Sequence, residues 1–263
     1  MPLTPLQAAI GRLLATNRSE DSYLAGGAAL LAAPETTRYS HDLDYFQDSA
    51  DRVATAFAAD HDLLLAHGYT VATEISQPGY IRVVVRRDQA ATKVEWAQDS
   101  TWRFLPVIRS EAFGYQLHPI DLATNKVLAL AGRDEPRDLL DTLHLHASEL
   151  PLGALVWAAV GKDPGYSPLS LLDMLRRRGR IRPADLARLD LTAPMDPVAL
   201  KESWLAALAQ ADRLVRRLPP EQAGCLYYSP SRRAFVCPDP DDPGDALPHH
   251  GRPGGVLPRV TDH

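Results

Sequence analysis

The chain has 263 residues, of which 45% are hydrophobic and 23% charged, and its formal net charge is −5. This composition is typical of a soluble protein with a substantial core, and no apolar run approaches the roughly 20 residues of a membrane span. Because the N-terminus lacks a basic start followed by an apolar block, we expect a cytoplasmic protein with no membrane partner.

The first elements alternate between helix and strand. Apolar spacing predicts a helix over residues 6–15. Residues 23–33 begin as a short strand, then meet Gly26 and Gly27 before a small-residue, helix-prone stretch, and residues 38–46 alternate as a strand does. This order indicates a strand, a glycine turn, a helix and a second strand.

A helix and three strands complete this part of the chain. Ser49 is a candidate cap for a helix to Gly68, whose apolar positions are Val53, Phe57, Leu64 and Leu65. The β-rich runs 69–75, 80–87 and 92–97 follow, with a turn at 77–79. We expect one mixed sheet in an α/β (α+β) domain that spans residues 1–118.

The remaining residues predict a mainly helical lobe over 119–222. Pro119 suits a first helical position, Gly132 a helix end and Pro136 a second start, and residues 167–218 are largely helical in pattern. Residues 223–238 indicate a small hairpin that brings Cys225 near Cys237, with a disulfide not expected. Residues 239–263 are rich in Pro, Gly, Asp and His and predict a disordered tail.

Two aspartates are the strongest chemical signal. Asp42 and Asp44 are separated by one residue on the predicted strand, so their side chains project from the same face while Leu43 points into the core. Two carboxylates placed in this way can hold two magnesium ions about 3.5 to 4 Å apart. A lone Asp-x-Asp is more often a solvated acidic pair, so its surroundings decide its meaning.

The surroundings favour phosphate chemistry. Gly26 and Gly27 would let the backbone approach a phosphate closely, although a Gly-Gly pair is otherwise a plain turn. Arg38 and Ser40 share strand parity with Asp42 and are expected along the same face as the metal ligands.

A second group of charges lies in the predicted helices. Lys126 could reach a phosphate as a point charge, or could be an ordinary solvated lysine. Arg137 and Asp141 lie at i and i+4, which suits either a salt bridge or a site, and Asp138 is an alternative to Asp141 as the functional acid.

These residues resemble the AbiEii/AbiGii-type nucleotidyltransferase toxin family, within the DNA polymerase β-like nucleotidyltransferases. The resemblance covers roughly residues 20–145. Its first motif is similar to residues 26–30, followed by Arg38-x-Ser40-x-Asp42-Leu43-Asp44, and its later motifs to residues 126–130 with Arg133, Arg137, Asp138 and Asp141. Gly27 departs from the serine that related enzymes commonly have. Glu95 could be the third carboxylate that such enzymes often place on an adjacent strand, or a strand-edge Glu paired with Lys93 or Arg87.

The resemblance implies a polymerase β-like mixed sheet with flanking helices, and transfer of a nucleotidyl group from an NTP with Mg²⁺. Asp42 and Asp44 would bind metal, Lys126 and Arg38 the triphosphate, and Asp141 and Glu95 would organise the acceptor. The family further implies a tRNA 3′ end as the acceptor and an antitoxin as partner. Alternatives are a small-molecule nucleotidyltransferase of the aminoglycoside-modifying kind, and a catalytically silent NTP- or partner-binding module.

A basic run in the helical lobe bears on the acceptor. Residues 176–182 read Arg-Arg-Arg-Gly-Arg-Ile-Arg, enough to neutralise several phosphates in a chain whose overall charge is negative. Arginines also suit the last turn of a helix that ends at Gly179. The sequence leaves RNA contact and structural capping equally open.

Overall fold

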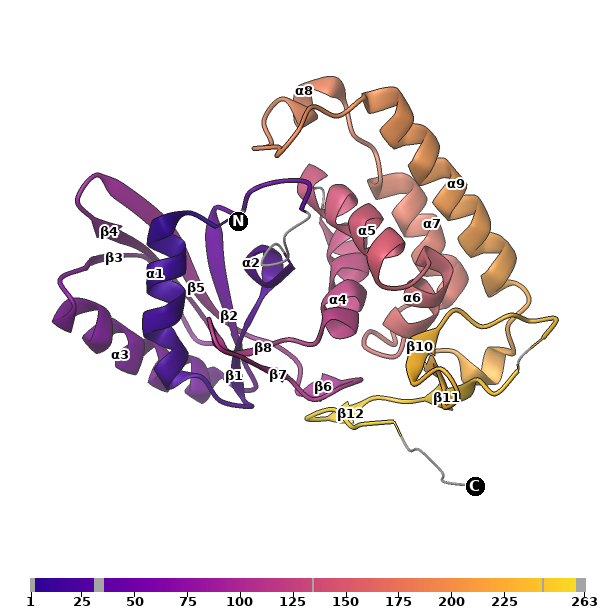
Figure 1. The fold of residues 1–263 in the computed structure, drawn as a ribbon, viewed down its shortest axis with the longest axis horizontal. Helices are drawn as coiled ribbons and strands as arrows, with labels where there is room; N and C mark the ends of the chain where they lie inside the picture. The colour runs from indigo at the N-terminus through magenta and orange to yellow at the C-terminus, as the bar shows by residue number, and fades with distance from the viewer. Residues whose placement is uncertain (1–2, 31–35, 134, 243, 259–263) are drawn as a thin grey trace. The chain divides into compact units, whose positions relative to one another are not determined.

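The computed structural model describes residues 3–30, 36–133, 135–242 and 244–258. The chain forms two compact units (Figure 1). The first unit is Met1–His118 with Pro253–Gly255, and the second is Pro119–Arg252 with Val256–His263. Among the described residues, no helix is both long and apolar enough to cross a membrane.

The first unit is built on a seven-stranded mixed sheet with the order β3-β4-β5-β2-β1-β8-β7. The pairs β2–β5 and β1–β8 are parallel, and the other neighbours are antiparallel. The strands are β1 (Ser22–Ala25), β2 (Asp42–Gln47), β3 (Thr70–Gln77), β4 (Tyr80–Arg87), β5 (Ala90–Gln98), β7 (Ile108–Ser110) and β8 (Gly114–Gln116). The predicted mixed sheet is therefore present.

Helices cover one face of this sheet. They are α1 (Pro5–Leu14), which continues into the 3₁₀ turn η1 (Ala15–Asn17), and α3 (Ala50–Ala66); the short α2 (Gly26–Leu30) follows β1. Every second residue of the central strands is buried under them, including Leu43, Tyr45, Val83, Val85, Val94 and Trp96. The intervening residues of β2, β4 and β5 lie on the opposite face.

The helix starts follow from their capping residues. Ser49 accepts a hydrogen bond from the N–H of Arg52 at 3.1 Å and begins α3, as predicted, and Thr4 caps α1 in the same way through Gln7. Leu65, predicted on the apolar face of α3, is 49% exposed instead. Its neighbour Leu64 fills that place in the core, because a helix buries only one stripe of its surface.

A buried ion pair joins α3 to the sheet. Arg18 pairs with Asp60, and neither side chain is exposed. The indole N–H of Trp96 donates to Asp60 at 2.7 Å, and the Arg18 guanidinium lies 4.5 Å from the ring centre of Tyr45. Because every charge in this group has partners, it fixes α3 on the back of the strands that carry the candidate site.

The second unit is mainly helical. Its helices are α4 (Pro119–Gly132), α5 (Pro136–Ser148), α6 (Leu152–Ala159), α7 (Pro168–Arg178), α8 (Pro183–Leu186) and α9 (Pro197–Val215), followed by the turn η2 (Pro220–Gln222). All residues of α6 are buried, and this helix contacts α4, α5, α7 and α9. The sequence carries no periodic signal for α6, because a helix that is apolar on all sides has no polar face.

The hairpin also forms, as β9 (Leu226–Ser229) and β10 (Ala234–Val236), and Cys225 and Cys237 are both free thiols. The prediction of a disordered tail from residue 239 is wrong for β11 (Leu247–His249), which pairs with the other edge of β9. Backbone pairing orders this segment without an apolar core, and Asp245 also accepts hydrogen bonds from Ser229 and Ser231. Further on, β12 (Arg252–Pro253) pairs with β6 (Trp102–Arg103).

Candidate metal centre

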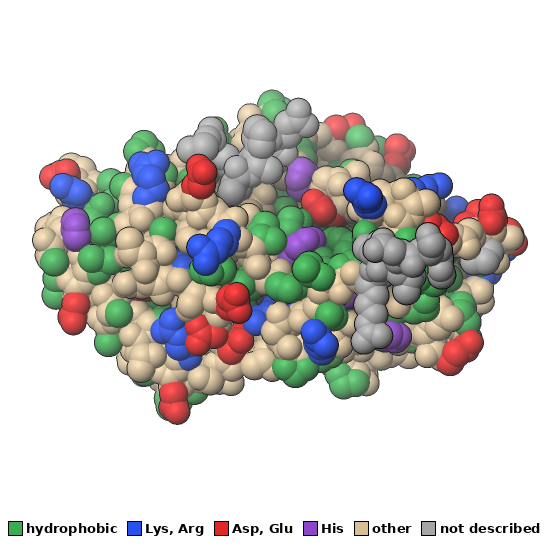
Figure 2. All heavy atoms as spheres, turned by 60° about the horizontal axis from the view of Figure 1, so that its bottom comes forward, with side chains coloured by type: hydrophobic (Ala, Val, Ile, Leu, Met, Phe, Trp, Pro, Cys, Tyr) green, Lys and Arg blue, Asp and Glu red, His purple; other side chains and the backbone are tan. Residues whose placement is uncertain are grey.

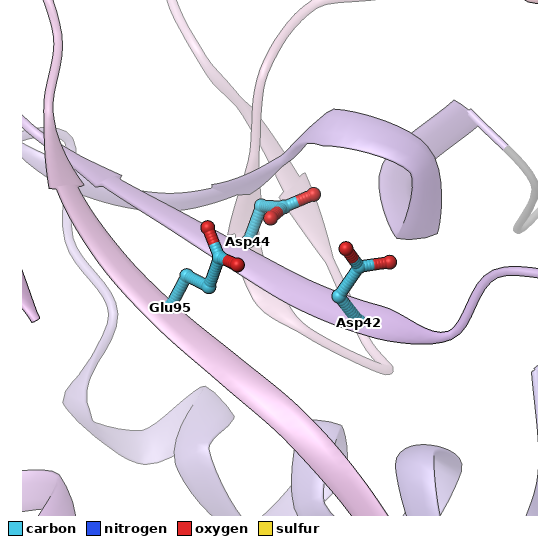
Figure 3. Close-up of side chains that lie close together, drawn as sticks. All are labelled: Asp42, Asp44 and Glu95. Carbon is cyan, nitrogen blue, oxygen red and sulfur yellow. The ribbon is translucent and has the colours of Figure 1, made fainter. Parts of the chain in front are cut away.

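Three carboxylates of the first unit converge on the face of the sheet that α1 and α3 leave uncovered. Asp42 and Asp44 come from β2 and Glu95 from the adjacent β5, and one oxygen atom of each lies within 4.8 Å of the others. Figure 3 shows the three side chains close together, on the same side of the two strands. All three residues are partly buried, so the group is accessible without being an ordinary solvated acidic patch.

The strand geometry explains this convergence. Alternation along β2 buries Leu43 and Tyr45 and leaves Asp42 and Asp44 on the other face, as predicted. The parallel register of β2 and β5 then places Glu95 opposite Asp44. Carboxylate oxygens are the ligands that Mg²⁺ prefers, and several of them at one point suit divalent cations. The donor set therefore fits a magnesium ion.

Glu95 is held by two residues of β4. The hydroxyl of Tyr80 donates to Glu95 Oε2 at 2.9 Å, and Arg82 Nε donates to Glu95 Oε1 at 2.7 Å. Desolvation and the hydrogen bond to Glu95 raise the pKa of Tyr80 to about 12. The predicted alternative, a pair with Lys93 or Arg87, is not what the sheet forms: the antiparallel register sets Arg82 opposite Glu95, and Lys93 pairs with Glu74.

The glycine turn lies directly beside these carboxylates. Gly26 has a φ of +60°, and a Cβ atom at this position would be 1.8 Å from Asp44 Oδ2. At Gly27 a Cβ atom would be 3.1 Å from both Arg38 Nη2 and Ser40 Oγ. The turn that begins α2 is thus in contact with the carboxylate site on one side and with Arg38 and Ser40 on the other.

The prediction that Arg38 and Ser40 continue the strand is wrong, because β2 begins at Asp42. The preceding segment is fixed by side-chain hydrogen bonds instead of a strand ladder. Gln7 Nε2 donates to the Ser40 carbonyl at 3.1 Å, and Ser40 Oγ donates to the Asp42 carbonyl at 3.1 Å. Both Arg38 and Ser40 are buried, and they reach the glycine turn by this route and not by strand parity.

The predicted charges of the second unit form a buried cluster. Lys126 Nζ lies 2.7 Å from Asp141 and 3.3 Å from Asp138, and Arg133 Nε lies 2.6 Å from Asp138. The Lys126 side chain is 7% exposed and both aspartates are fully buried, so Lys126 is not a solvated helix lysine. Arg137 Nε lies 4.0 Å from Glu135.

The arginine run divides into two kinds of residue. Arg176 pairs with Asp173 at 2.6 Å and with Asp212 of α9 at 2.7 Å, so it joins two helices. Arg177 and Arg178 are exposed in the last turn of α7. On the face that Figure 2 presents, basic and acidic side chains are interspersed.

Sequence reasoning missed Tyr80 and Arg82. Both residues lie on the same face of β4 and are partly buried. Their alternation with the apolar Ile81 and Val83 was the available sequence signal, because it places both side chains on the face opposite the core. Only the register between β4 and β5 identifies Glu95 as their partner.

Comparison with known proteins supports the fold. No protein-family model and no curated protein matches the sequence. Among solved structures, the nucleotidyltransferase toxin MenT4 of Mycobacterium tuberculosis is similar with a TM-score of 0.52 and 17% identity, covering 82% of this chain and 83% of that one. A candidate nucleotidyltransferase from Helicobacter pylori matches at 0.49 and 15%, covering 81% and 96% of the two chains. A second H. pylori protein, JHP933, matches at 0.49 and 17%, covering 81% and 90%. The likeness to MenT4 shows that the chain has a nucleotidyltransferase fold, as predicted.

Proposed function

We propose that this protein is a magnesium-dependent nucleotidyltransferase that moves NMP from an NTP to an acceptor hydroxyl and releases pyrophosphate. The convergence of Asp42, Asp44 and Glu95 carries the proposal. Carboxylate oxygens from three residues that lie this close together form a donor set that suits a divalent cation. The nucleotidyltransferase fold agrees with this reading of the site.

Each of the three carboxylates has a role in the proposed reaction. Asp42 and Asp44 would hold the metal ions, and Mg²⁺ bound there would neutralise charge on the triphosphate and on the attacking oxygen. Glu95 accepts the proton of the acceptor hydroxyl as that oxygen forms a bond to the α-phosphorus. The bond from this phosphorus to the bridging oxygen of pyrophosphate breaks, and pyrophosphate leaves with the electron pair.

The glycine turn has the features of a phosphate contact. Gly26 brings the backbone against Asp44, and the N–H groups at the start of α2 can then approach a metal-bound phosphate. We assign Gly26, Gly27, Arg38 and Ser40 to the nucleotide side of the site. This assignment needs no serine hydroxyl at position 27, because the backbone supplies the donors.

The second unit also carries residues that we assign to the reaction, namely Lys126, Arg137 and Asp141. Lys126 would bind the triphosphate and Asp141 would organise the acceptor, with Asp138 as the alternative acid. In the structure the Lys126 ammonium is paired with both aspartates. Binding of a phosphate would therefore replace one of these two ion pairs. Arg137 would bind the nucleotide as a second positively charged side chain.

We further propose that the acceptor is a tRNA 3′ end and that the protein acts in the cytoplasm as the toxin of a toxin–antitoxin pair. The family resemblance of the motifs supports this, and the exposed Arg177 and Arg178 could contact phosphates of an RNA stem without reading its sequence. An antitoxin protein would be the partner that restrains the activity.

Label transfer tests the proposal. The protein is incubated with Mg²⁺, total tRNA and each α-labelled NTP in turn, and the expected result is label at an RNA 3′ end, preferentially from one nucleotide. Label on an aminoglycoside with none on RNA would retain the reaction and replace the acceptor. No label on any acceptor under any metal condition would favour a silent NTP-binding module.

A further inference from the structure

Glu95, the third carboxylate, forms an ion pair with Arg82 of the neighbouring strand β4. Arg82 Nε lies 2.7 Å from one oxygen of Glu95, and the hydroxyl of Tyr80 donates to the other oxygen at 2.9 Å. The Glu95 side chain is 15% exposed and that of Arg82 31% exposed, so water screens this pair only in part. Cross-strand register fixes the contact, because Arg82 lies directly opposite Glu95.

This contact changes the charge that a metal ion would meet. Asp42, Asp44 and Glu95 together carry three negative charges when ionised, and their oxygens lie within 4.8 Å of one another. Arg82 is within ion-pair distance of one of them and offsets one of the three charges. A divalent cation is therefore attracted less strongly than the acidic trio alone would attract it.

The same contact also orients Glu95. Each of its oxygens accepts one hydrogen bond from β4, and a carboxylate oxygen can accept more than one partner. Glu95 can therefore contact a metal ion or an acceptor hydroxyl without releasing Arg82. The two donors restrict the rotation of a long side chain that would otherwise have several conformations.

We propose that Arg82 is a positioning residue that directs Glu95 toward Asp44 while weakening metal binding, so that the site takes up its ions firmly only together with a nucleotide. The triphosphate would add the negative charge and the oxygen ligands that the trio, partly neutralised by Arg82, lacks. This inference rests on the proposed function, since it assumes that the three carboxylates bind metal. It predicts effects of opposite sign on metal affinity and on turnover.

The test measures Mn²⁺ binding to the full-length protein without nucleotide, and label transfer in parallel. In Arg82→Ala, Mn²⁺ should bind about three- to tenfold more tightly, as expected for removal of a unit charge near a partly solvated site, while kcat falls about tenfold or more. Arg82→Gln removes the charge but keeps an N–H donor, so it should also tighten Mn²⁺ binding and should lose less turnover. Arg82→Lys keeps the charge and should leave the Mn²⁺ affinity within about twofold of the wild type.

Arg86→Ala is the matched control. Arg86 lies on the same strand and the same face, opposite Ala91, and is exposed. Its loss should change neither the Mn²⁺ affinity nor kcat, which separates a local effect of Arg82 from the general charge of the sheet.

The outcomes distinguish the two proposals. Unchanged or weaker Mn²⁺ binding in both Arg82→Ala and Arg82→Gln, with circular dichroism showing folded proteins, would overturn the role of Arg82 and leave the nucleotidyltransferase proposal intact. If Arg82→Ala does not fold, Arg82→Gln decides alone. Absence of Mn²⁺ binding to the wild-type protein at millimolar concentration, with or without NTP, would remove the metal centre itself.

Discussion

Gly26 and Asp44 are in such close contact that the space of a Cβ atom at position 26 is already occupied by the Asp44 carboxylate, 1.8 Å from Oδ2. Gly26 also has a φ of +60°, which side chains disfavour. Both the backbone conformation and the space therefore require glycine at this position. The turn that starts α2 and the proposed metal ligand Asp44 of β2 are therefore in direct contact.

Gly26→Ala should consequently lower the free energy of unfolding by about 1–3 kcal/mol and abolish transfer, because the methyl group displaces Asp44. Denaturant unfolding and label transfer measure the two effects. Gly132→Ala is the control: nothing lies within 4 Å of a Cβ atom there, and alanine favours the helix, so stability should be unchanged or slightly higher. A Gly26→Ala protein with normal transfer would show that Asp44 is not held as described.

The buried pair of Arg18 and Asp60 should be important for folding but not for chemistry. Asp60→Ala leaves a buried guanidinium without its carboxylate and removes the acceptor of the Trp96 N–H, so we expect a loss of about 3–5 kcal/mol in unfolding free energy. Asp62→Ala, whose side chain is 86% exposed on the same helix, should cost less than about 0.5 kcal/mol. Equal stability of the two variants in urea would contradict the assigned role of the pair.

Lys126 is expected to serve stability as well as any nucleotide contact. Lys126→Ala leaves Asp138 and Asp141 buried with one cation fewer, which should cost about 3–5 kcal/mol. Lys201→Ala, an exposed helix lysine, should be nearly neutral. Loss of transfer in Lys126→Ala therefore counts as a triphosphate effect only if thermal unfolding shows that the variant is folded under the assay conditions. A stability close to that of Lys201→Ala would refute the buried cluster.

The arginine run should separate into structural and RNA-contacting residues. Replacing Arg177 and Arg178 together by Ala should weaken tRNA binding and lower the slope of log K against log salt by up to about two units, without changing NTP binding. The control removes the same charge from the exposed hairpin turn, at Arg232 and Arg233. If both double variants bind tRNA as the wild type does, the run is a helix end and not an RNA contact.

The parts of the site that depend on local sequence pattern could be predicted from the sequence alone. Alternation around Leu43 was enough to place Asp42 and Asp44 on one face, and the Gly26–Gly27 turn was recognisable from its composition. Strand pairing over long separations was not recognisable: about fifty residues separate Asp44 from Glu95 in the chain, and only the register of β2 and β5 sets them opposite each other. The contact of Arg82 with Glu95 depends on the next register along the sheet.

Two predictions about secondary structure were wrong for the same physical reason. The strand was expected to begin at Arg38, but Gln7 of α1 binds the backbone at Ser40, and a distant side chain cannot be read from local alternation. The tail was expected to lack structure, but β11 is ordered by the free edge of β9 and not by its own apolar residues. In each case a tertiary partner supplied what the segment itself lacked.

Asp44→Asn addresses the proposed role of Asp44 in holding the metal ions for nucleotidyl transfer, because the amide preserves the shape of the side chain and removes its charge. Two quantities are measured with Mg²⁺ for the wild type and the variant: the release of pyrophosphate, and the transfer of label from α-labelled NTP to total tRNA. Asp62→Asn is the control for an exposed aspartate. We predict that the wild type and Asp62→Asn release pyrophosphate and label RNA, and that Asp44→Asn is folded but at least about a hundredfold slower. Turnover by Asp44→Asn at the wild-type rate would mean that Asp44 does not hold a catalytic metal ion.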